Sequence, residues 1–292
     1  MDDIAFSRGP ARRPLPRVAD ALLQWSTGLQ TTDRRIYAGW LVEVGRNGTL
    51  DEAMEQAGFS RVTIRHGSGN IVTHWAVETG NMFVVADGVQ SISEMQHTTD
   101  RYGIAFGWGR NPTTGRQQSQ IRFRAFLQEL LAIGFQEPLL VTVKGTLTGD
   151  VIAALTHQYE VLDTVDAFRK ESGKSPLNAP FYACSIPLGP GQEVARGTTQ
   201  TKEITPIVAH IPSPITREYI AAHWVKRPWV ALIEGLIDQT IAWSTTTSAQ
   251  IAAGEDQTAA PIEEESAPVR TAPVRATQTN GHARRPVEDD LL

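Results

Sequence analysis

RVTIRHGSGNIVTHWAVETGNMFVVA, residues 61–86, is the segment from which the fold class follows. It contains three short runs rich in β-branched and aromatic residues, as strands are. They span 61–66, 70–77 and 81–86. Val62 and Ile64 alternate with polar residues, which indicates a sheet with one face toward water. Glycine-containing links join the runs and predict two successive hairpins.

Further strands and helices flank this segment on both sides. By composition and alternation, strands are expected at 35–44, 139–144, 181–188 and 202–211. By apolar spacing, helices are expected at 18–25, 49–58, 119–134, 149–172, 216–225 and 229–243, with Thr49 and Glu52 as a capping box. The Gly-rich segment 103–115 is interpreted as irregular. Because strands cluster instead of alternating with helices, we predict an α+β fold with mainly antiparallel sheet, packed helices and room for OB-like barrel elements.

The distribution of aromatic residues predicts the domain organisation. Every Trp, Tyr and Phe lies at or before Trp243, so the rest of the chain lacks the side chains that offset ordering entropy. We therefore expect a flexible N-terminal arm with a short helix over 1–34, a globular α+β body over 35–243, and a disordered acidic tail over 244–292. The body is either one domain or two subdomains, 35–134 and 138–243.

Charge and cysteine content limit the class of protein. The net charge is −5, and eight acidic residues against four arginines follow residue 248, so the body is close to neutral. The single cysteine, Cys184, excludes an intramolecular disulfide and a cysteine-rich zinc site, and we expect it to be a small core residue. The start of the chain lacks a signal-peptide pattern and no segment is apolar enough to cross a membrane. These features favour a soluble cytoplasmic protein.

Sequence signatures of catalysis are absent. Lys144-Gly145-Thr146 lacks the glycine-rich loop of a phosphate-binding P-loop, and Gly107 and Gly109 lack the third glycine of a dinucleotide fingerprint. No nucleophile elbow and no zinc-binding helix are found. The histidines contain no pair at helical spacing, so we expect neither a metal nor a cofactor.

Residues 101–126 carry the strongest functional signal in the body. The segment reads RYGIAFGWGRNPTTGRQQSQIRFRAF and contains five arginines, aromatic residues between them and no acid. A protein that binds single-stranded nucleic acid uses both kinds of residue, because cations follow the phosphates and aromatic faces stack on the bases. The expected binding residues are Arg101, Tyr102, Phe106, Trp108, Arg110, Arg116, Arg122 and Arg124, extended by Arg61, Arg65 and Lys144 if their strands are neighbours. The alternative is a core-packing segment with buried aromatic residues and solvated arginines.

The chain ends in Pro286-Val287-Glu288-Asp289-Asp290-Leu291-Leu292, an acidic cluster followed by two leucines. This ending, after a linker and a folded body, resembles the tail of bacterial single-stranded DNA-binding proteins. Glu288, Asp289 and Asp290 match the acidic run of that family, and Leu291 and Leu292 stand where its apolar end lies, although its Pro-Phe ending is missing. The resemblance covers only the tip and the general layout of the linker. It implies that the tip binds a basic partner protein.

Together these patterns favour a non-catalytic protein that binds single-stranded nucleic acid, with DNA favoured over RNA, in replication, recombination or a mobile element. A homo-oligomer is compatible with the sequence, and a membrane partner is not expected. One rival is an enzyme whose active site is assembled from dispersed residues such as His66, His74, Asp87 and Asp100. The other rival is a scaffold or assembly module that binds no nucleic acid.

Overall fold

The three runs within 61–86 form strands in the computed structural model. The structure describes residues 21–28, 30–31, 34–35, 37–65, 71–89, 102–110, 115–196 and 202–253. The strands are β5 (Ser60–Arg65), β6 (Ile71–Val77) and β7 (Gly80–Val84). β5 and β6 pair as an antiparallel hairpin, as predicted. The second predicted hairpin is wrong, because the other edge of β6 pairs with β4 while β7 pairs with β9 and β11.

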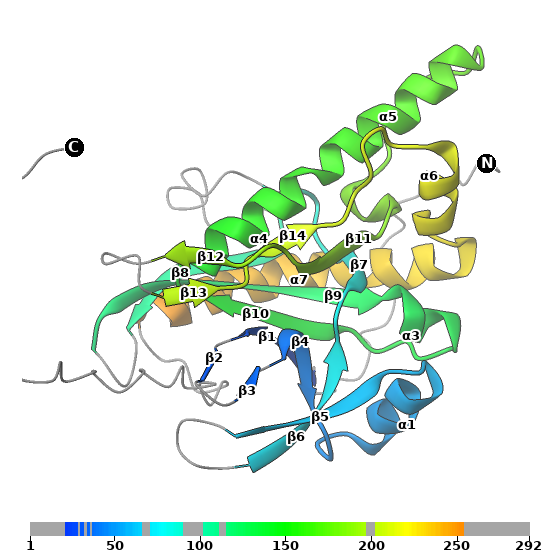
Figure 1. Ribbon diagram of the computed structural model, residues 1–292. Coiled ribbons are helices and arrows are strands. Elements are labelled where there is room, and N and C mark those ends of the chain that lie inside the picture. The colour runs from blue at the N-terminus through cyan, green and yellow to red at the C-terminus, as the bar shows by residue number, and fades with distance from the viewer. Residues whose placement is uncertain are drawn as a thin grey trace, which may run out of the picture.

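One ten-stranded sheet organises the described part of the chain (Figure 1). Its order is β14-β11-β7-β9-β10-β1-β4-β6-β5, and β8 pairs with β9 alongside this path. The remaining strands of the sheet are β1 (Ala21–Thr27), β4 (Ala38–Glu43), β8 (Ile104–Arg110), β9 (Gln117–Leu127), β10 (Leu139–Lys144), β11 (Ile186–Pro190) and β14 (Ile207–Ala209). Two small ribbons are β2 (Gln30–Thr31) with β3 (Arg34–Arg35), and β12 (Val194–Arg196) with β13 (Lys202–Ile204). Among the described pairs only β1–β10 is parallel, so the predicted α+β class with a mainly antiparallel sheet is confirmed.

Strands from both halves of the body meet in this sheet. β10 lies between β9, from the first half, and β1, from the start of the chain. The predicted helix over 18–25 is wrong where it is described, because 21–27 is β1. Leu23 and Trp25 share one buried face at the two-residue spacing of a strand, and pairing with β10 and β4 satisfies the backbone.

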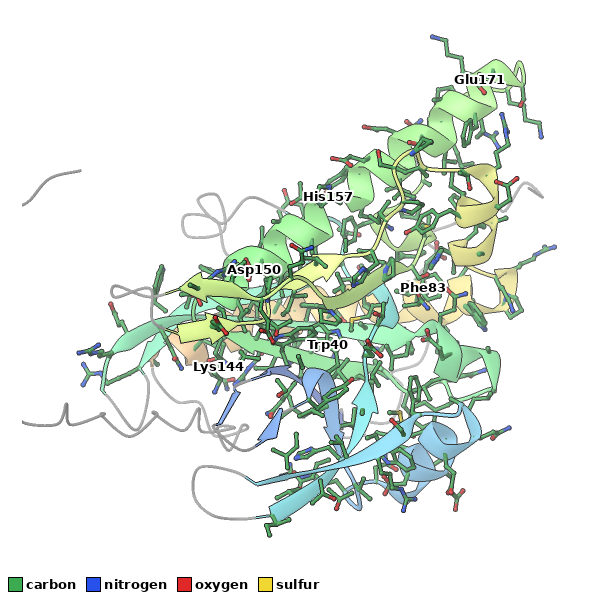
Figure 2. The ribbon with its side chains drawn as sticks, in the orientation of Figure 1. Trp40, Phe83, Lys144, Asp150, His157 and Glu171 are labelled. Carbon is green, nitrogen blue, oxygen red and sulfur yellow. The ribbon has the colours of Figure 1, made fainter. Side chains whose placement is uncertain are left out.

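The sheet curls around its own core, which gives it a half-barrel form (Figure 1). Trp40 on β4 reaches across the interior and donates its indole N–H to the carbonyl of Leu188 on β11 at 2.9 Å (Figure 2). Trp25 donates in the same way to the carbonyl of Thr205 at 3.1 Å, and its ring meets Trp40 edge-on at 4.8 Å. The Trp40 indole therefore joins β4 to β11, and the Trp25 indole joins β1 to the residue after β13. Both buried indole N–H groups have a hydrogen-bond acceptor, as burial requires.

The helices are α1 (Gly48–Gln56), α3 (Gln128–Ala132), α4 (Leu147–Thr156), α5 (Gln158–Glu171), α6 (Arg217–His223) and α7 (Arg227–Ala253), with a 3₁₀ turn at Phe181–Ala183. α1 begins at Gly48, one residue before the predicted start at Thr49. Its N-cap is Asn47, whose side chain accepts a hydrogen bond from Leu50 N–H. The predicted helix over 119–134 is mostly strand β9. None of the described helices has the length and apolarity needed to cross a membrane.

α7 continues beyond the predicted body. Residues 244–253, which we expected to be disordered, form its last turns and pack along β8. The face of these turns toward β8 carries small polar residues, among them the buried Ser248, whose Oγ accepts a hydrogen bond from Phe106 N–H. Facing glycines 107 and 109 on β8 let this backbone approach closely. Tertiary packing therefore orders a segment without aromatic residues. The rest of the predicted tail, 254–292, and residues 1–20 of the predicted arm lie outside the described residues.

Candidate nucleic-acid interface

The acid-free segment forms the β8–β9 hairpin, so its residues alternate between two faces. The register runs from Ile104 opposite Phe123 to Arg110 opposite Gln117. Phe106, Trp108 and Arg110 therefore share the face of the sheet that forms the half-barrel core. Arg122 and Arg124 on β9 point to the opposite, outer face, where α7 packs. The hairpin thus divides the predicted binding residues into two groups.

The aromatic residues of this segment have different environments. Phe106 is 2% exposed and belongs to the core, so its predicted role as a stacking platform is wrong. Trp108 is 46% exposed, and its ring meets that of Phe106 edge-on at 6.4 Å. Tyr102 is half-buried at the base of β8, where its carbonyl accepts a hydrogen bond from Asp87 N–H. Trp108 is therefore the aromatic residue of the set that presents a face to solvent.

Exposed polar side chains lie beyond Trp108 toward the end of the hairpin. Arg110 is exposed two residues further along β8, and Arg116 is exposed just before β9. Gln117 lies opposite Arg110 and is also exposed, which places an amide beside the guanidinium. Sequence reasoning missed Gln117, because its position depends on the hairpin register and no residue-type signal identifies it.

The outer-face cations are engaged within the protein. Arg122 is 6% exposed and already has interactions inside the chain, so its predicted role as a phosphate contact is wrong. The guanidinium of Arg124 lies 5.0 Å from the ring centre of Trp243 on α7, which is a cation–π contact. Lys144 is half-buried at the end of β10, opposite Gln120 of β9 (Figure 2). Of the three residues expected to extend the surface, Lys144 is the one on a neighbouring strand.

Arg61 and Arg65 lie on β5, far from the hairpin. Four strands separate β5 from β9 in the sheet, so the condition that the strands be neighbours is not met for Arg61 and Arg65. The Arg61 guanidinium stacks at 4.4 Å on the ring of Trp75 and reaches Glu55 at 3.7 Å. This arginine covers a core tryptophan and forms an exposed ion pair.

The residues named for an enzymatic alternative are not brought together in the described structure. His74 is buried on β6, whereas Asp87 follows β7, and four strands separate β6 from β7. His66 and Asp100 lie outside the described residues, as do Arg101 and the tip residues Glu288, Asp289, Asp290, Leu291 and Leu292. Where the chain is described, no group of three His, Cys, Asp or Glu side chains is arranged to hold a metal ion.

Ser185 and His223 form a pair that the sequence did not indicate. The Ser185 hydroxyl lies 2.9 Å from His223 Nδ1, within the distance of a nucleophile and its base. The same hydroxyl donates a hydrogen bond to the Gln128 side-chain oxygen at 2.6 Å, and Ser185 is fully buried. Burial also lowers the pKa of His223, which favours a neutral ring. These contacts connect α3, α6 and the residue that precedes β11.

Cys184 is part of a small core between α5 and α6, which confirms the expected role. It is 1% exposed and packs with Val161, Val165 and Ile220. Burial raises the pKa of the Cys184 thiol to about 12, so the reactive thiolate is scarce near neutral pH.

We therefore expect a disulfide reagent at pH 8 to label native Cys184 only when the protein opens. The labelling rate should rise with urea in parallel with the loss of circular dichroism. Unfolded protein in high urea, where the thiol is accessible, provides the maximal rate as a control. Fast labelling of the native protein would contradict a sealed α5–α6 core.

Comparisons with protein families, with curated proteins and with solved structures gave no match to this chain.

Proposed function

We propose that this protein binds single-stranded nucleic acid, preferably DNA, at the end of the β8–β9 hairpin. The observation that supports this most is the exposed Trp108 ring beside the exposed guanidinium of Arg110. A half-exposed indole offers an aromatic face on which a base can stack. Stacking of a base on such a ring contributes about 1–3 kcal/mol.

The surroundings of Trp108 fit a charged, planar ligand. Arg110 and Arg116 are both exposed near this end of the hairpin, and arginine contacts phosphate through two parallel hydrogen bonds. Gln117 supplies an amide that donates to a phosphate or a base edge. The Trp108 ring meets the buried Phe106 edge-on at 6.4 Å, which joins one side of the proposed platform to the core.

The proposal is tested by titrating oligo-dT into the purified protein and following tryptophan fluorescence at several salt concentrations. We expect quenching, and a log K that falls linearly with log salt because bound counterions are released. The Arg110→Glu/Arg116→Glu double variant should bind at least about tenfold more weakly at low salt, and its slope should be shallower by at least about 1.4.

Arg227→Glu serves as the matched control for charge reversal. Arg227 is exposed at the first residue of α7, at the other end of that helix from the hairpin. Reversing it changes net charge by −2, as the reversal at Arg110 or at Arg116 does, and should leave oligo-dT affinity nearly unchanged. Equal weakening by Arg227→Glu would indicate a diffuse charge effect, and absence of any binding by the parent protein at low salt would favour the scaffold alternative.

The wider setting is part of the same proposal. We place the protein in the cytoplasm, in replication, recombination or a mobile element. The acidic tip Glu288–Leu292 is proposed to recruit a basic partner protein, since acids followed by apolar residues suit a basic, pocketed surface. A pull-down with a peptide of residues 286–292, against one with its three acids neutralised, tests this part separately.

A further inference from the structure

Trp108, Arg110 and Gln117 lie on one face of the hairpin end. Alternate residues of a strand share a face, and so do residues that lie opposite each other in an antiparallel pair. Gln117 lies directly opposite Arg110, and all three residues are exposed. The Cβ atoms of opposite residues are about 4.5–5.5 Å apart and those of diagonal residues about 7–8 Å. The three side chains can therefore reach one planar ligand.

The Arg110 and Gln117 side chains are uncommitted, unlike the polar side chains around them. Arg116, Gln118 and the outer-face polar residues of β9 all have interactions within the protein. Ser119 Oγ donates to a backbone carbonyl at 2.9 Å. Within the described part of the chain, neither the Arg110 guanidinium nor the Gln117 amide has a hydrogen-bond or ion-pair partner. Their hydrogen-bonding groups are therefore available to a ligand.

A guanidinium beside an amide suits the edge of a base. The guanidinium only donates, and it can bond two neighbouring acceptors at once. The amide both donates and accepts, and its carbonyl oxygen finds no donor on an ionised phosphate. Across the pair, Arg110 offers two donors and Gln117 offers a donor and an acceptor. The complementary edge therefore has two adjacent acceptors followed by a donor.

Guanine and cytosine have edges with this order of groups, whereas adenine and thymine alternate acceptor and donor. Guanine presents the acceptors N7 and O6 and then the N1–H donor, and cytosine presents O2, N3 and then its amino group. Guanine has two rings to stack on an indole, and arginine on its O6 and N7 is the commonest specific contact to a base. The N1–H group is accessible only where guanine is unpaired, as in a single strand. Guanine in a single strand is therefore the ligand that fits best.

We propose that the hairpin end selects guanine in single-stranded nucleic acid. The base stacks on Trp108, its N7 and O6 accept hydrogen bonds from Arg110, and Gln117 donates to O6 and accepts from N1–H. The inference rests on the proposed function, because it specifies which base occupies that site. On oligo-dT, which lacks this edge, the Arg110 guanidinium contacts a phosphate instead.

The test measures fluorescence anisotropy of labelled oligo-dT strands in which one central base is replaced, with the full-length protein. The strand with guanine should bind at least about fivefold more tightly than oligo-dT, the lower end of the range for one bidentate contact. Hypoxanthine keeps N7, O6 and N1–H and should bind as guanine does. 7-Deazaguanine lacks N7 and should lose most of the gain, and cytosine should gain less because only one ring stacks.

Substitutions assign the preference to this pair of residues. Arg110→Lys keeps the charge but loses the parallel donors, so the guanine preference should fall close to parity while oligo-dT binding is largely kept. Gln117→Ala should lower the preference as well. Arg116→Lys is the matched control at the other exposed arginine of the hairpin end, and it should leave the guanine preference unchanged.

Equal affinity of the parent protein for the guanine strand and for oligo-dT would overturn the inference and leave the proposed function in place. A guanine preference that Arg110→Lys retains in full would overturn the assignment to Arg110. Guanosine monophosphate, used as a competitor, should displace the strand only weakly. Binding of this nucleotide as tightly as the guanine strand would overturn recognition of a strand, and failure of every strand to bind would overturn the proposed function itself.

Discussion

Gly107→Val should separate the last turns of α7 from β8 and destabilise the protein by about 1–3 kcal/mol, the usual cost of overpacking. The Cβ alone would lie 3.0 Å from Ile251 Cγ2 and 3.4 Å from the Ser248 carbonyl, and the valine methyl groups extend further. The hydrogen bond between Phe106 N–H and Ser248 Oγ should weaken as the helix moves away. Urea unfolding measures the loss, and amide hydrogen exchange over 240–253 locates it.

Gly235→Ala is the control on the same helix. No atom lies within 4 Å of a Cβ placed on Gly235, so the added methyl group meets no obstacle. Alanine should stabilise α7 by up to about 1 kcal/mol, because glycine is the poorer helix former. If Gly107→Val were as well tolerated as Gly235→Ala, with unchanged exchange in the last turns, the packing of α7 on β8 would be refuted.

Phe106→Ala should mainly lower the stability of the protein, whereas Trp108→Ala should mainly lower its affinity for oligo-dT, although the two residues are only two positions apart. Phe106 is 2% exposed, so removing its ring leaves a cavity and should cost about 3–5 kcal/mol. Trp108 is 46% exposed, so its removal should change the free energy of unfolding far less. It should nevertheless weaken oligo-dT binding roughly 5- to 150-fold, which corresponds to a stacking contribution of about 1–3 kcal/mol.

Two measurements on each variant separate these outcomes. Urea unfolding gives stability, and fluorescence anisotropy of labelled oligo-dT gives affinity per folded molecule. Trp108→Phe is the conservative control, because it keeps an aromatic face and should retain part of the affinity. The assignment of Trp108 to the interface fails if Trp108→Ala binds as the parent does while Phe106→Ala, still folded, does not.

The β8–β9 hairpin was not predicted from the acid-free segment, because 103–115 was interpreted as irregular and 119–134 as a helix. Apolar residues at helical spacing, such as Phe123, Leu127 and Leu130, predicted a helix where β9 lies. β9 is covered on both faces, by the core and by α7, so the two-residue alternation of a half-exposed strand is lost. For the same reason the sequence did not show that Arg122 is buried.

The sequence likewise did not predict how far α7 extends. Residues 244–253 lack aromatic side chains, and composition alone favours disorder there. Ser248 and its small neighbours are instead what a helix needs to approach glycines 107 and 109 on β8. The two halves of this contact lie about 140 residues apart in the sequence, and no local pattern joins them.

By itself, the sequence determined the class of fold, the strands within 60–84, the small-core role of Cys184 and the concentration of arginine and aromatic residues in one segment. These follow from local alternation, burial preference and composition, which are properties of neighbouring residues. The tertiary structure decided which of those residues face solvent, because exposure depends on strand order and on what packs against each face. Phe106 and Trp108 show this most directly, since they share one strand and one face, yet the core ends between them.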